Sequence, residues 1–159
     1  MMQPMAQDLP GGIGSNNWKS DLSDSEQARL SELLESLASD PFLRRVAQRS
    51  MELMTIEAGN DLLDVGCGTG VLLPVLAELA TVSGTVTGID HAADLIEAAR
   101  VRVGSLPLAA NVSLVLGDAT SLPFNDDAFD AAHVERVLMH LDDPDATIRK
   151  MRRVVRPGG

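Results

Sequence analysis

The chain has 159 residues, which is enough for one domain with a sizeable core and too short for two full domains. Its formal net charge of −10 argues against a nucleic-acid backbone or an anionic membrane surface as the main partner. A single cysteine excludes an intrachain disulfide, and no window approaches the ~20 apolar residues of a membrane-spanning helix. Because no secretory signal pattern is seen either, we expect a cytoplasmic protein.

The first part of the chain predicts a short helical unit after a flexible segment. Residues 1–20 are rich in proline, glycine and asparagine, which favours a flexible lead-in. A capping box that begins at Ser23, followed by leucines at helical spacing, predicts a helix from about 24 to 38. A second helix is predicted after Asp40, which would be its N-cap, because a proline follows at the first helical position. Residues 21–57 are therefore predicted to form an N-terminal helical cap.

From residue 58 to residue 159 the pattern alternates between strand and helix. The strands are predicted at 62–65, 85–90, 112–116 and 129–134, and the helices at 71–81, at 94–103 and from 144 onward. Short connections between such units imply parallel strands joined by right-handed crossovers, with helices on both faces of the sheet. The sequence therefore predicts an α/β fold with a mostly parallel sheet.

A glycine turn follows the first predicted strand. The strand contains Asp64 and ends at Val65, and then Gly66, Gly68 and Gly70 stand at every second position before an apolar, helix-like run. Glycine allows backbone angles and a close ligand approach that a Cβ would forbid, and the helix adds the positive end of its dipole. The turn is thus typical of a ligand cradle. Cys67 inside it is predicted to be a small packed residue and not a nucleophile.

Two acids at later strand ends predict a nucleoside site beside this turn. Asp90 ends the second strand, where a carboxylate can accept hydrogen bonds from both hydroxyls of a ribose. Its alternative role is the N-cap of the segment that follows. Asp118 follows the third strand and could accept a hydrogen bond from an adenine amino group, with the Ala119 N–H near a ring nitrogen. The alternative for Asp118 is a turn-forming Asx residue.

The spacing of the glycines also distinguishes dinucleotide cofactors from other adenosyl ligands. A dinucleotide site needs its third glycine three residues after the second, and Val71 occupies that position here. The spacing therefore disfavours NAD and FAD, and it favours an adenosyl ligand that has no pyrophosphate. No metal is predicted, because the acids belong to different strand ends and no His/Cys cluster has the spacing of metal ligands.

In combination, the motifs resemble the class I S-adenosylmethionine-dependent methyltransferases, and among these the small-molecule group that includes the ubiquinone and menaquinone C-methyltransferases. The motifs that carry the resemblance are Leu62–Gly70, Gly88–Asp90, Gly117–Phe124, Phe129-Asp130, His140–Pro144 and Arg156–Gly159. The resemblance implies a Rossmann-like sheet, S-adenosyl-L-methionine as the cofactor, and in-line transfer of its methyl group to a small molecule.

The resemblance also implies a set of cofactor contacts. In this set Asp64 supports the turn, the first two glycines lie against the methionine part, and Thr69 contributes from the same loop. Asp90 binds the ribose with His91 beside the adenine, and Glu135 lines the passage between the sulfonium and the substrate. The alternative for Glu135 is a solvated turn residue. The implied cofactor site consists of Asp64, Gly66, Gly68, Thr69, Asp90, His91, Asp118, Ala119 and Glu135.

A catalytic residue is not defined by the sequence. His140 is a candidate general base, since imidazole titrates near neutral pH. Enzymes of this class, however, often act by holding the nucleophile in line with the methyl group and excluding water, without any base. His133, inside the fourth predicted strand, is interpreted as a packed or edge histidine. The methyl acceptor is left open as well.

The sequence departs from the resemblance after Arg156-Pro157-Gly158-Gly159, where a fifth strand would begin. Strands five to seven are missing, so the fourth strand is predicted to be an exposed sheet edge. We expect a truncated form of a longer gene product. The alternatives are a homo-oligomer that pairs through this edge, or a non-catalytic adenosyl-binding fragment or interaction module. A nucleotide-dependent oxidoreductase is the weaker alternative.

Overall fold

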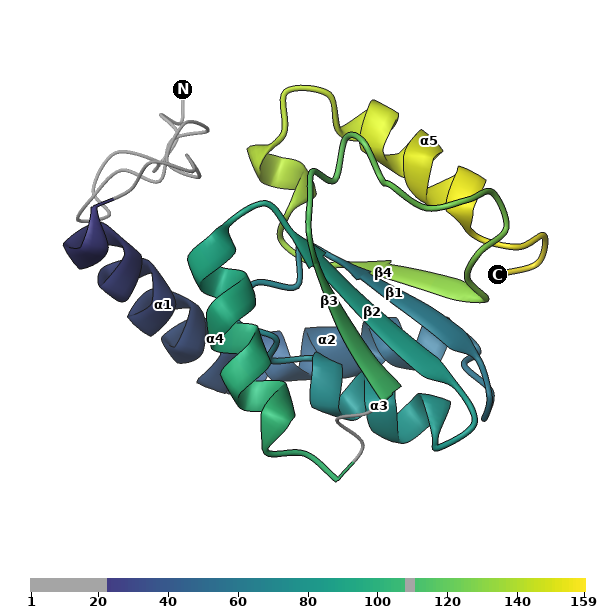
Figure 1. The fold of residues 1–159 in the computed structure, drawn as a ribbon, viewed down its shortest axis with the longest axis horizontal. Helices are drawn as coiled ribbons and strands as arrows, with labels where there is room; N and C mark the ends of the chain where they lie inside the picture. Colours follow the sequence, from purple (N-terminus) through teal and green to yellow (C-terminus); the bar gives the residue numbers. More distant parts are fainter. Residues whose placement is uncertain (1–22, 108–110) are drawn as a thin grey trace, which may run out of the picture.

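The computed structural model describes residues 23–107 and 111–159, so the predicted lead-in at 1–20 lies outside the described residues. Figure 1 shows the order of the elements along the chain. They are α1 (Asp24–Ser39), α2 (Pro41–Leu53), β1 (Asp61–Val65), α3 (Leu73–Ala80), β2 (Thr85–Asp90), α4 (Ala93–Gly104), β3 (Val112–Leu116), β4 (Ala131–Val134), the 3-10 helix η2 (Leu138–His140) and α5 (Pro144–Val154). Each predicted strand and helix is present, with some ends shifted. The division into a cap (21–57) and a body (58–159) stays a prediction.

The sheet has four strands in the order β3-β2-β1-β4, and each neighbouring pair is parallel. All carboxyl ends of the strands therefore meet at one edge of the sheet (Figure 1). The chain adds β2 and β3 on one side of β1 and then places β4 on its other side. This reversal creates the crevice in which open α/β sheets bind their ligands, between the carboxyl ends of β1 and β4.

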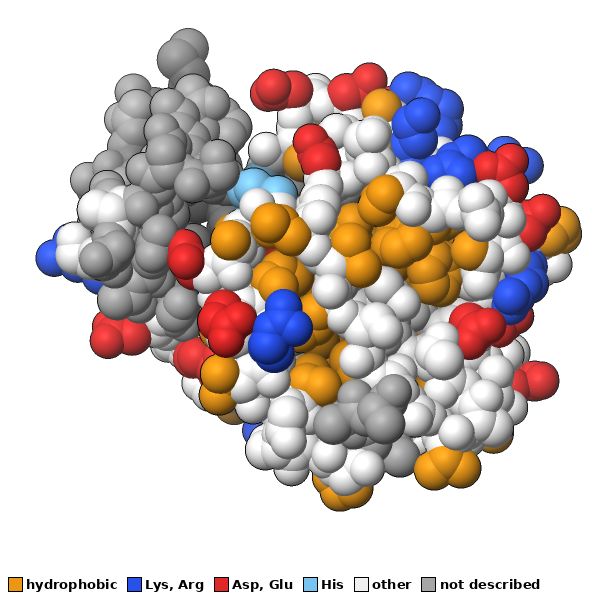
Figure 2. Space-filling model, in the orientation of Figure 1, with side chains coloured by type: hydrophobic (Ala, Val, Ile, Leu, Met, Phe, Trp, Pro, Cys, Tyr) orange, Lys and Arg blue, Asp and Glu red, His pale blue; other side chains and the backbone are white. Residues whose placement is uncertain are grey.

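Helices cover both faces of the sheet, which confirms the predicted fold class. Leu62 faces a core formed with α2, α3 and α4, whereas Leu63 and Val65 face a second core formed with α5 and the segment before β4. Leu62, Leu63 and Val65 are fully buried. A central strand between two helical layers is apolar on both of its sides, which explains the continuous apolar run. Figure 2 shows apolar side chains at the surface over the sheet below α5.

Two elements begin two residues later than predicted, and the other ends differ by one residue at most. The fourth strand was predicted from residue 129 but begins at Ala131, and Phe129 instead forms an isolated parallel bridge with Val155. The ring of Phe129 packs edge-to-face against Phe124, with 5.0 Å between the ring centroids. The helix predicted from Val71 begins at Leu73, because the turn that follows the glycines occupies the preceding residues. Among the described residues β4 is an edge strand, as predicted.

Arg156 links the segment after α5 to the start of β1. Its guanidinium donates to the Asp130 carboxylate and lies 3.5 Å from Asp61, whose backbone N–H donates to Asp130 over 2.7 Å. The hydrogen bond from Arg156 lowers the pKa of Asp130, aided by the bond from the Asp61 N–H. A lowered carboxylate pKa stabilises the fold above the unfolded-state pKa of ~3.9, and this contribution disappears as the pH falls through the folded-state pKa.

We therefore expect Arg156→Gln to reduce the free energy of unfolding at pH 7 and to reduce it by a smaller amount near pH 3. The loss at pH 7 should be modest, because the pair is partly solvated. Urea unfolding at the two pH values measures both differences. Arg149→Gln is the matched control, since Arg149 lies 3.7 Å from Asp143 in an exposed pair. An equal loss of stability at both pH values would contradict the role of the Asp130 carboxylate.

Candidate functional site

A cavity of about 850 Å³ lies at the carboxyl edge of the sheet, at the crevice between β1 and β4. Its wall combines the glycine turn with the segments that follow β2, β3 and β4, and three leucines of α1 (Leu33, Leu34 and Leu37) add an apolar side. The structure brings all of the sequence candidates to this wall. They are Asp64, Gly66, Gly68, Thr69, Asp90, His91, Asp118, Ala119, Glu135 and His140.

The glycine turn is held close to the strands. Gly66 has a φ of +73°, and a Cβ added there would lie 2.2 Å from Cγ2 of Val137 in the segment after β4. Gly70 has a φ of +75°, and its Cβ would lie 3.0 Å from that of Ala99 on α4. The backbone N–H groups of Gly66 and Cys67 both donate to the Ile89 carbonyl of β2. Side chains at the first and last glycine are thus excluded on steric grounds.

Asp90 fixes the turn and the following loop at the same time. One carboxylate oxygen accepts the Gly68 N–H over 2.9 Å, and the other accepts the Ala92 N–H over 3.0 Å. The N-cap residue of α4 is Ala92, which makes no side-chain cap hydrogen bond, so Asp90 does not take the N-cap role that the sequence left open. A carboxylate oxygen has two lone pairs, so each can accept one further hydrogen bond. Asp90 can therefore keep this position and still bind a diol. The His91 ring lies 3.4 Å from the same carboxylate.

The Asp118 side chain forms the Asx turn that was its alternative role. One of its oxygens accepts both the Thr120 N–H (2.7 Å) and the Thr120 hydroxyl (2.8 Å). Asp118 is exposed at the cavity wall, and Ala119 follows it there in a turn. Asp118 and Ala119 therefore lie at the cavity wall, with one carboxylate oxygen of Asp118 used by the turn.

Thr69 joins the turn to two helices. Its hydroxyl donates to Glu35 of α1 over 2.9 Å, and its carbonyl accepts Nε–H of Arg102 in α4 over 2.9 Å. Arg102 also donates to the Glu35 carboxylate. This contact positions α1 beside α4 (Figure 1). The sequence did not predict it, because Glu35 and Arg102 have the ordinary appearance of surface charges.

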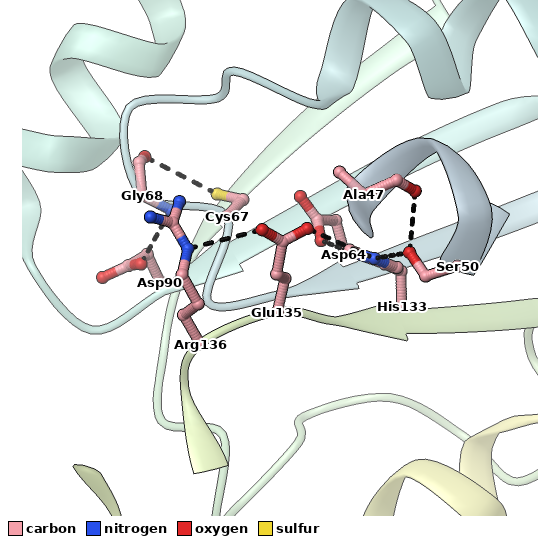
Figure 3. A network of polar contacts seen from close by, with 9 residues as sticks. All are labelled: Ala47, Ser50, Asp64, Cys67, Gly68, Asp90, His133, Glu135 and Arg136. Carbon is pink, nitrogen blue, oxygen red and sulfur yellow. Dashed lines mark hydrogen bonds and ion pairs between the residues drawn. The ribbon is translucent and has the colours of Figure 1, made fainter. Parts of the chain in front are cut away.

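A buried polar network lies below the turn (Figure 3). Asp64 and His133 are register partners in β1 and β4, and their side chains are 5% and 4% exposed. Nδ1 of His133 is 3.0 Å from the Asp64 carboxylate, and Nε2 is 3.0 Å from the hydroxyl of Ser50 in α2. His133 is thus a buried histidine of an edge strand, as interpreted from the sequence. Its link to Ser50 was not predicted.

Glu135 is adjacent to this network and faces the cavity. Its Oε1 lies 3.4 Å from Nε of Arg136, and its Oε2 lies 4.0 Å from Nε2 of His133. Oε2 is buried and has no hydrogen-bond partner among the described residues. A buried carboxylate oxygen without a donor is costly, so a ligand that supplies a donor would be bound favourably here.

The Cys67 thiol and the His140 imidazole differ in how burial affects their protonation. Burial raises the pKa of the Cys67 thiol, and the charges of Asp64 and Asp90 raise it further, so the thiol stays protonated. His140 lies in η2, and burial lowers its pKa, which keeps the imidazole neutral at pH 7 and able to accept a proton.

Within 23–107 and 111–159, no three His, Cys, Asp or Glu side chains are grouped as a metal site requires. No helix in these ranges is long and apolar enough to cross a membrane.

A family model described as a methyltransferase domain matches residues 63–159. The chain therefore belongs to the methyltransferase domain family, and its parallel sheet with helices on both faces is that of a class I, S-adenosylmethionine-dependent methyltransferase. The resemblance inferred from the motifs is confirmed.

Several characterised proteins are similar to this chain. Methyltransferase GfsG from Streptomyces halstedii is 39% identical over 72% of the chain and 41% of its own length. The ubiquinone biosynthesis O-methyltransferase of Xanthomonas oryzae pv. oryzae is 36% identical over 64% of the chain and 41% of its own length. The crystal structure of the [4+2]-cyclase SpnF is 36% identical, with a TM-score of 0.67, over 74% of this chain and 42% of that one. The chain thus spans less than half the length of these proteins.

The residues at the cavity fit the cofactor of this family. Gly66 and Gly68 of the turn line the cavity, and Asp90, which also lines it, keeps unused lone pairs. Glu135 supplies a buried acceptor that lacks a donor. S-adenosylmethionine has a ribose diol and an ammonium group, which are donors of the kind that these carboxylates can accept.

Proposed function

We propose that this chain binds S-adenosylmethionine in the cavity and forms part of the active site of a methyltransferase that acts on a small molecule. The observation that carries the proposal is the Asp90 carboxylate, which is held against the Gly68 N–H at the switch point of a parallel sheet. Membership of the methyltransferase domain family supports the same function.

Each candidate residue has a proposed contact with the cofactor. Gly66 and Gly68 lie against its methionine part, with Thr69 in the same loop and Asp64 below it. Asp90 accepts hydrogen bonds from the ribose hydroxyls with His91 beside the adenine, and the adenine edge lies near Asp118 and Ala119. Glu135 lines the passage from the sulfonium to the acceptor. These roles rest on the placement of the residues at one cavity wall.

When bound, S-adenosylmethionine supplies an electrophilic methyl group on a sulfonium sulfur. The protein must then hold the acceptor in line with this methyl group and exclude water. The leucines of α1 provide an apolar wall that excludes water, and the neutral His140 imidazole is placed to accept a proton from the acceptor.

The charge of the wall favours an uncharged acceptor. The acidic residues of the wall are Asp64, Asp90, Asp118, Glu135, Asp142 and Asp143, whereas Arg136 is its one arginine or lysine among the described residues. Such a surface attracts the cationic cofactor and repels an anionic acceptor. We infer that the acceptor is a small, largely apolar molecule without negative charge. The name of the Xanthomonas relative supports O-methylation.

We infer that the whole protein acts in the cytoplasm. The free edge of β4 can pair with a further strand of a longer chain or with a second copy of this one, because an unpaired strand edge presents open N–H and C=O groups.

The cofactor assignment is tested by ligand-induced thermal stabilisation. S-adenosylhomocysteine at a hundred times its Kd stabilises the folded state by about 2.7 kcal/mol, which corresponds to a rise in Tm of about 5–10 °C for a domain of this size. NADH at the same concentration is expected to leave the Tm unchanged. An equal response to both compounds, or to neither, would contradict the proposal.

Methyl transfer itself needs a separate measurement, because SpnF has this fold and is named a cyclase. The test follows a labelled methyl group from S-adenosylmethionine to a panel of uncharged phenols, quinols and amines, with carboxylated analogues as controls. We expect transfer to uncharged members of the panel and none to their anionic analogues. Binding of the cofactor without transfer to any member would favour the non-catalytic adenosyl-binding alternative.

A further inference from the structure

The hydrogen-bond partners of His133 determine its protonation state. The Ser50 hydroxyl donates its one hydrogen to the Ala47 carbonyl over 2.8 Å, so its oxygen accepts a hydrogen from Nε2 of His133. On the other side of the ring, an ionised Asp64 can only accept a hydrogen bond, so Nδ1 must also donate. With the Ser50 hydroxyl donating to Ala47 and Asp64 ionised, both ring nitrogens donate, and His133 is then an imidazolium between β1 and α2.

The surroundings of His133 agree with this charge. The groups packed around it are Asp64 on β1, Glu135 just after β4 and the uncharged Ser50 on α2, and Arg136 lies on the far side of Glu135 (Figure 3). Burial by itself lowers the pKa of His133, but the hydrogen bond and charge of Asp64, together with the charge of Glu135, raise it above the ordinary value. The imidazolium thus lies behind two carboxylates that face the cavity.

We propose that His133 is a positioning residue of the cofactor site, which holds Asp64 and Glu135 as oriented carboxylates below the glycine turn and links them to α2 through Ser50. The inference rests on the proposed function, because the ligand at these carboxylates is taken to be the methionine part of the cofactor. His133 does not line the cavity, so it acts through the two acids.

Deprotonation of His133 removes this arrangement. A neutral ring keeps one N–H, so it holds both Asp64 and Ser50 only if the Ser50 hydroxyl turns from the Ala47 carbonyl to Nε2, and Glu135 loses its nearest buried cation. S-adenosylhomocysteine has an ammonium and a carboxylate and no net charge, so the change in the overall charge of the site largely cancels for this ligand. The loss of orientation then decides the outcome, and affinity falls as the pH rises through the pKa of His133.

Thermodynamic linkage makes this inference measurable in two ways. If deprotonation weakens S-adenosylhomocysteine by about tenfold, saturation with the ligand must raise the pKa of His133 by about one unit. The free energy of unfolding of the ligand-free protein must also depend on the protonation of His133. Because the folded-state pKa is raised, the contribution of His133 to stability is complete below ~6.5 and is lost as the pH rises through the folded-state value.

The experiment is an NMR titration of imidazole resonances together with calorimetry of S-adenosylhomocysteine binding between pH 6 and pH 9. The chain has three histidines, and His140 is an internal control because burial shifts its pKa downward. We expect a raised pKa for His133, a further rise of about one unit on ligand saturation, and about tenfold weaker binding at high pH.

Variants separate positioning from folding. Glu135→Gln and Ser50→Ala should each lower the pKa of His133, because each removes a partner of the imidazolium. His133→Gln removes the titrating group, so its affinity for S-adenosylhomocysteine should be weak and independent of pH over this range. If His133→Gln does not fold, Ser50→Ala provides the comparison, since it keeps the Asp64–His133 pair and Ser50 is not among the residues of the cavity wall.

Two results overturn the inference in different ways. In the first result, S-adenosylhomocysteine binds with the same affinity across the His133 titration, and the ligand does not change the pKa of His133. This result would refute the positioning role and leave the proposed function intact. Absence of binding at every pH by the folded protein would refute the proposed function, and the positioning role with it.

Discussion

Asp90→Ala is expected to abolish the thermal stabilisation by S-adenosylhomocysteine while the protein stays folded. The substitution removes the carboxylate that would accept both ribose hydroxyls, and it also releases the Gly68 N–H of the turn. A hydrogen bond to a charged group contributes about 1.5–3 kcal/mol, so the loss of two such bonds weakens binding by about a hundredfold or more. Calorimetric titration of purified variants measures the affinity directly.

The control for Asp90→Ala is Asp94→Ala. Asp94 is an exposed acid in the first turn of α4, and it is not among the residues of the cavity wall, so its removal changes the net charge equally. We expect Asp94→Ala to bind S-adenosylhomocysteine with nearly unchanged affinity. A folded Asp90→Ala protein with the same affinity as the parent chain would remove the ribose role from Asp90.

The proximity of the candidate residues at one cavity wall was predictable because the main signals are local. The glycine turn and the acid at the end of the next strand each follow directly from a strand pattern, and in a parallel sheet all carboxyl ends meet at one edge. Once the strands at 62–65 and 85–90 were recognised, the proximity of Asp64, Gly68 and Asp90 followed from topology without any knowledge of tertiary contacts. The order of the elements along the chain was predictable for the same reason.

Long-range polar contacts were not predictable in this way. Ser50 and His133 are 83 residues apart, and neither one belongs to a motif. Their contact depends on how α2 packs below β1 and β4, which one sequence does not define. The Glu35–Thr69 bond likewise depends on the position of α1. A histidine inside an apolar strand was the one available signal, because a buried imidazole requires polar partners.

The exact ends of elements were also decided by tertiary contacts. The pattern from Phe129 onward is that of a strand, yet the backbone of Phe129 pairs with Val155 beyond α5 and not with β1. Asp118 shows a similar competition within a turn. Its carboxylate can serve a ligand or its own loop, and the two bonds from Thr120 show that the loop uses one oxygen.

Gly66→Ala is expected to lower both the stability of the protein and its affinity for S-adenosylhomocysteine. An alanine at a φ of +73° costs about 1–2 kcal/mol, and its Cβ would lie 2.2 Å from Cγ2 of Val137, a contact that adds about 1–3 kcal/mol. Val137 connects Glu135 to η2 with His140, so relief of the clash moves one wall of the cavity. Urea unfolding and calorimetry measure the two effects.

A double-mutant cycle with Val137→Ala separates the backbone strain from the clash. Val137→Ala removes Cγ2, so in the Val137→Ala background Gly66→Ala should cost only the positive φ, about 1–2 kcal/mol, with a coupling energy close to the cost of the contact. Gly104→Ala is the control: no atom lies within 4 Å of its added Cβ at the end of α4, and it should be neutral or slightly stabilising. Additive losses in the cycle would show that Val137 does not exclude a side chain at position 66. A coupling energy near the cost of the contact would show that position 66 requires glycine because the segment after β4 packs onto the turn. The turn and this segment, which form two sides of the cavity, are then held in place by the same contact.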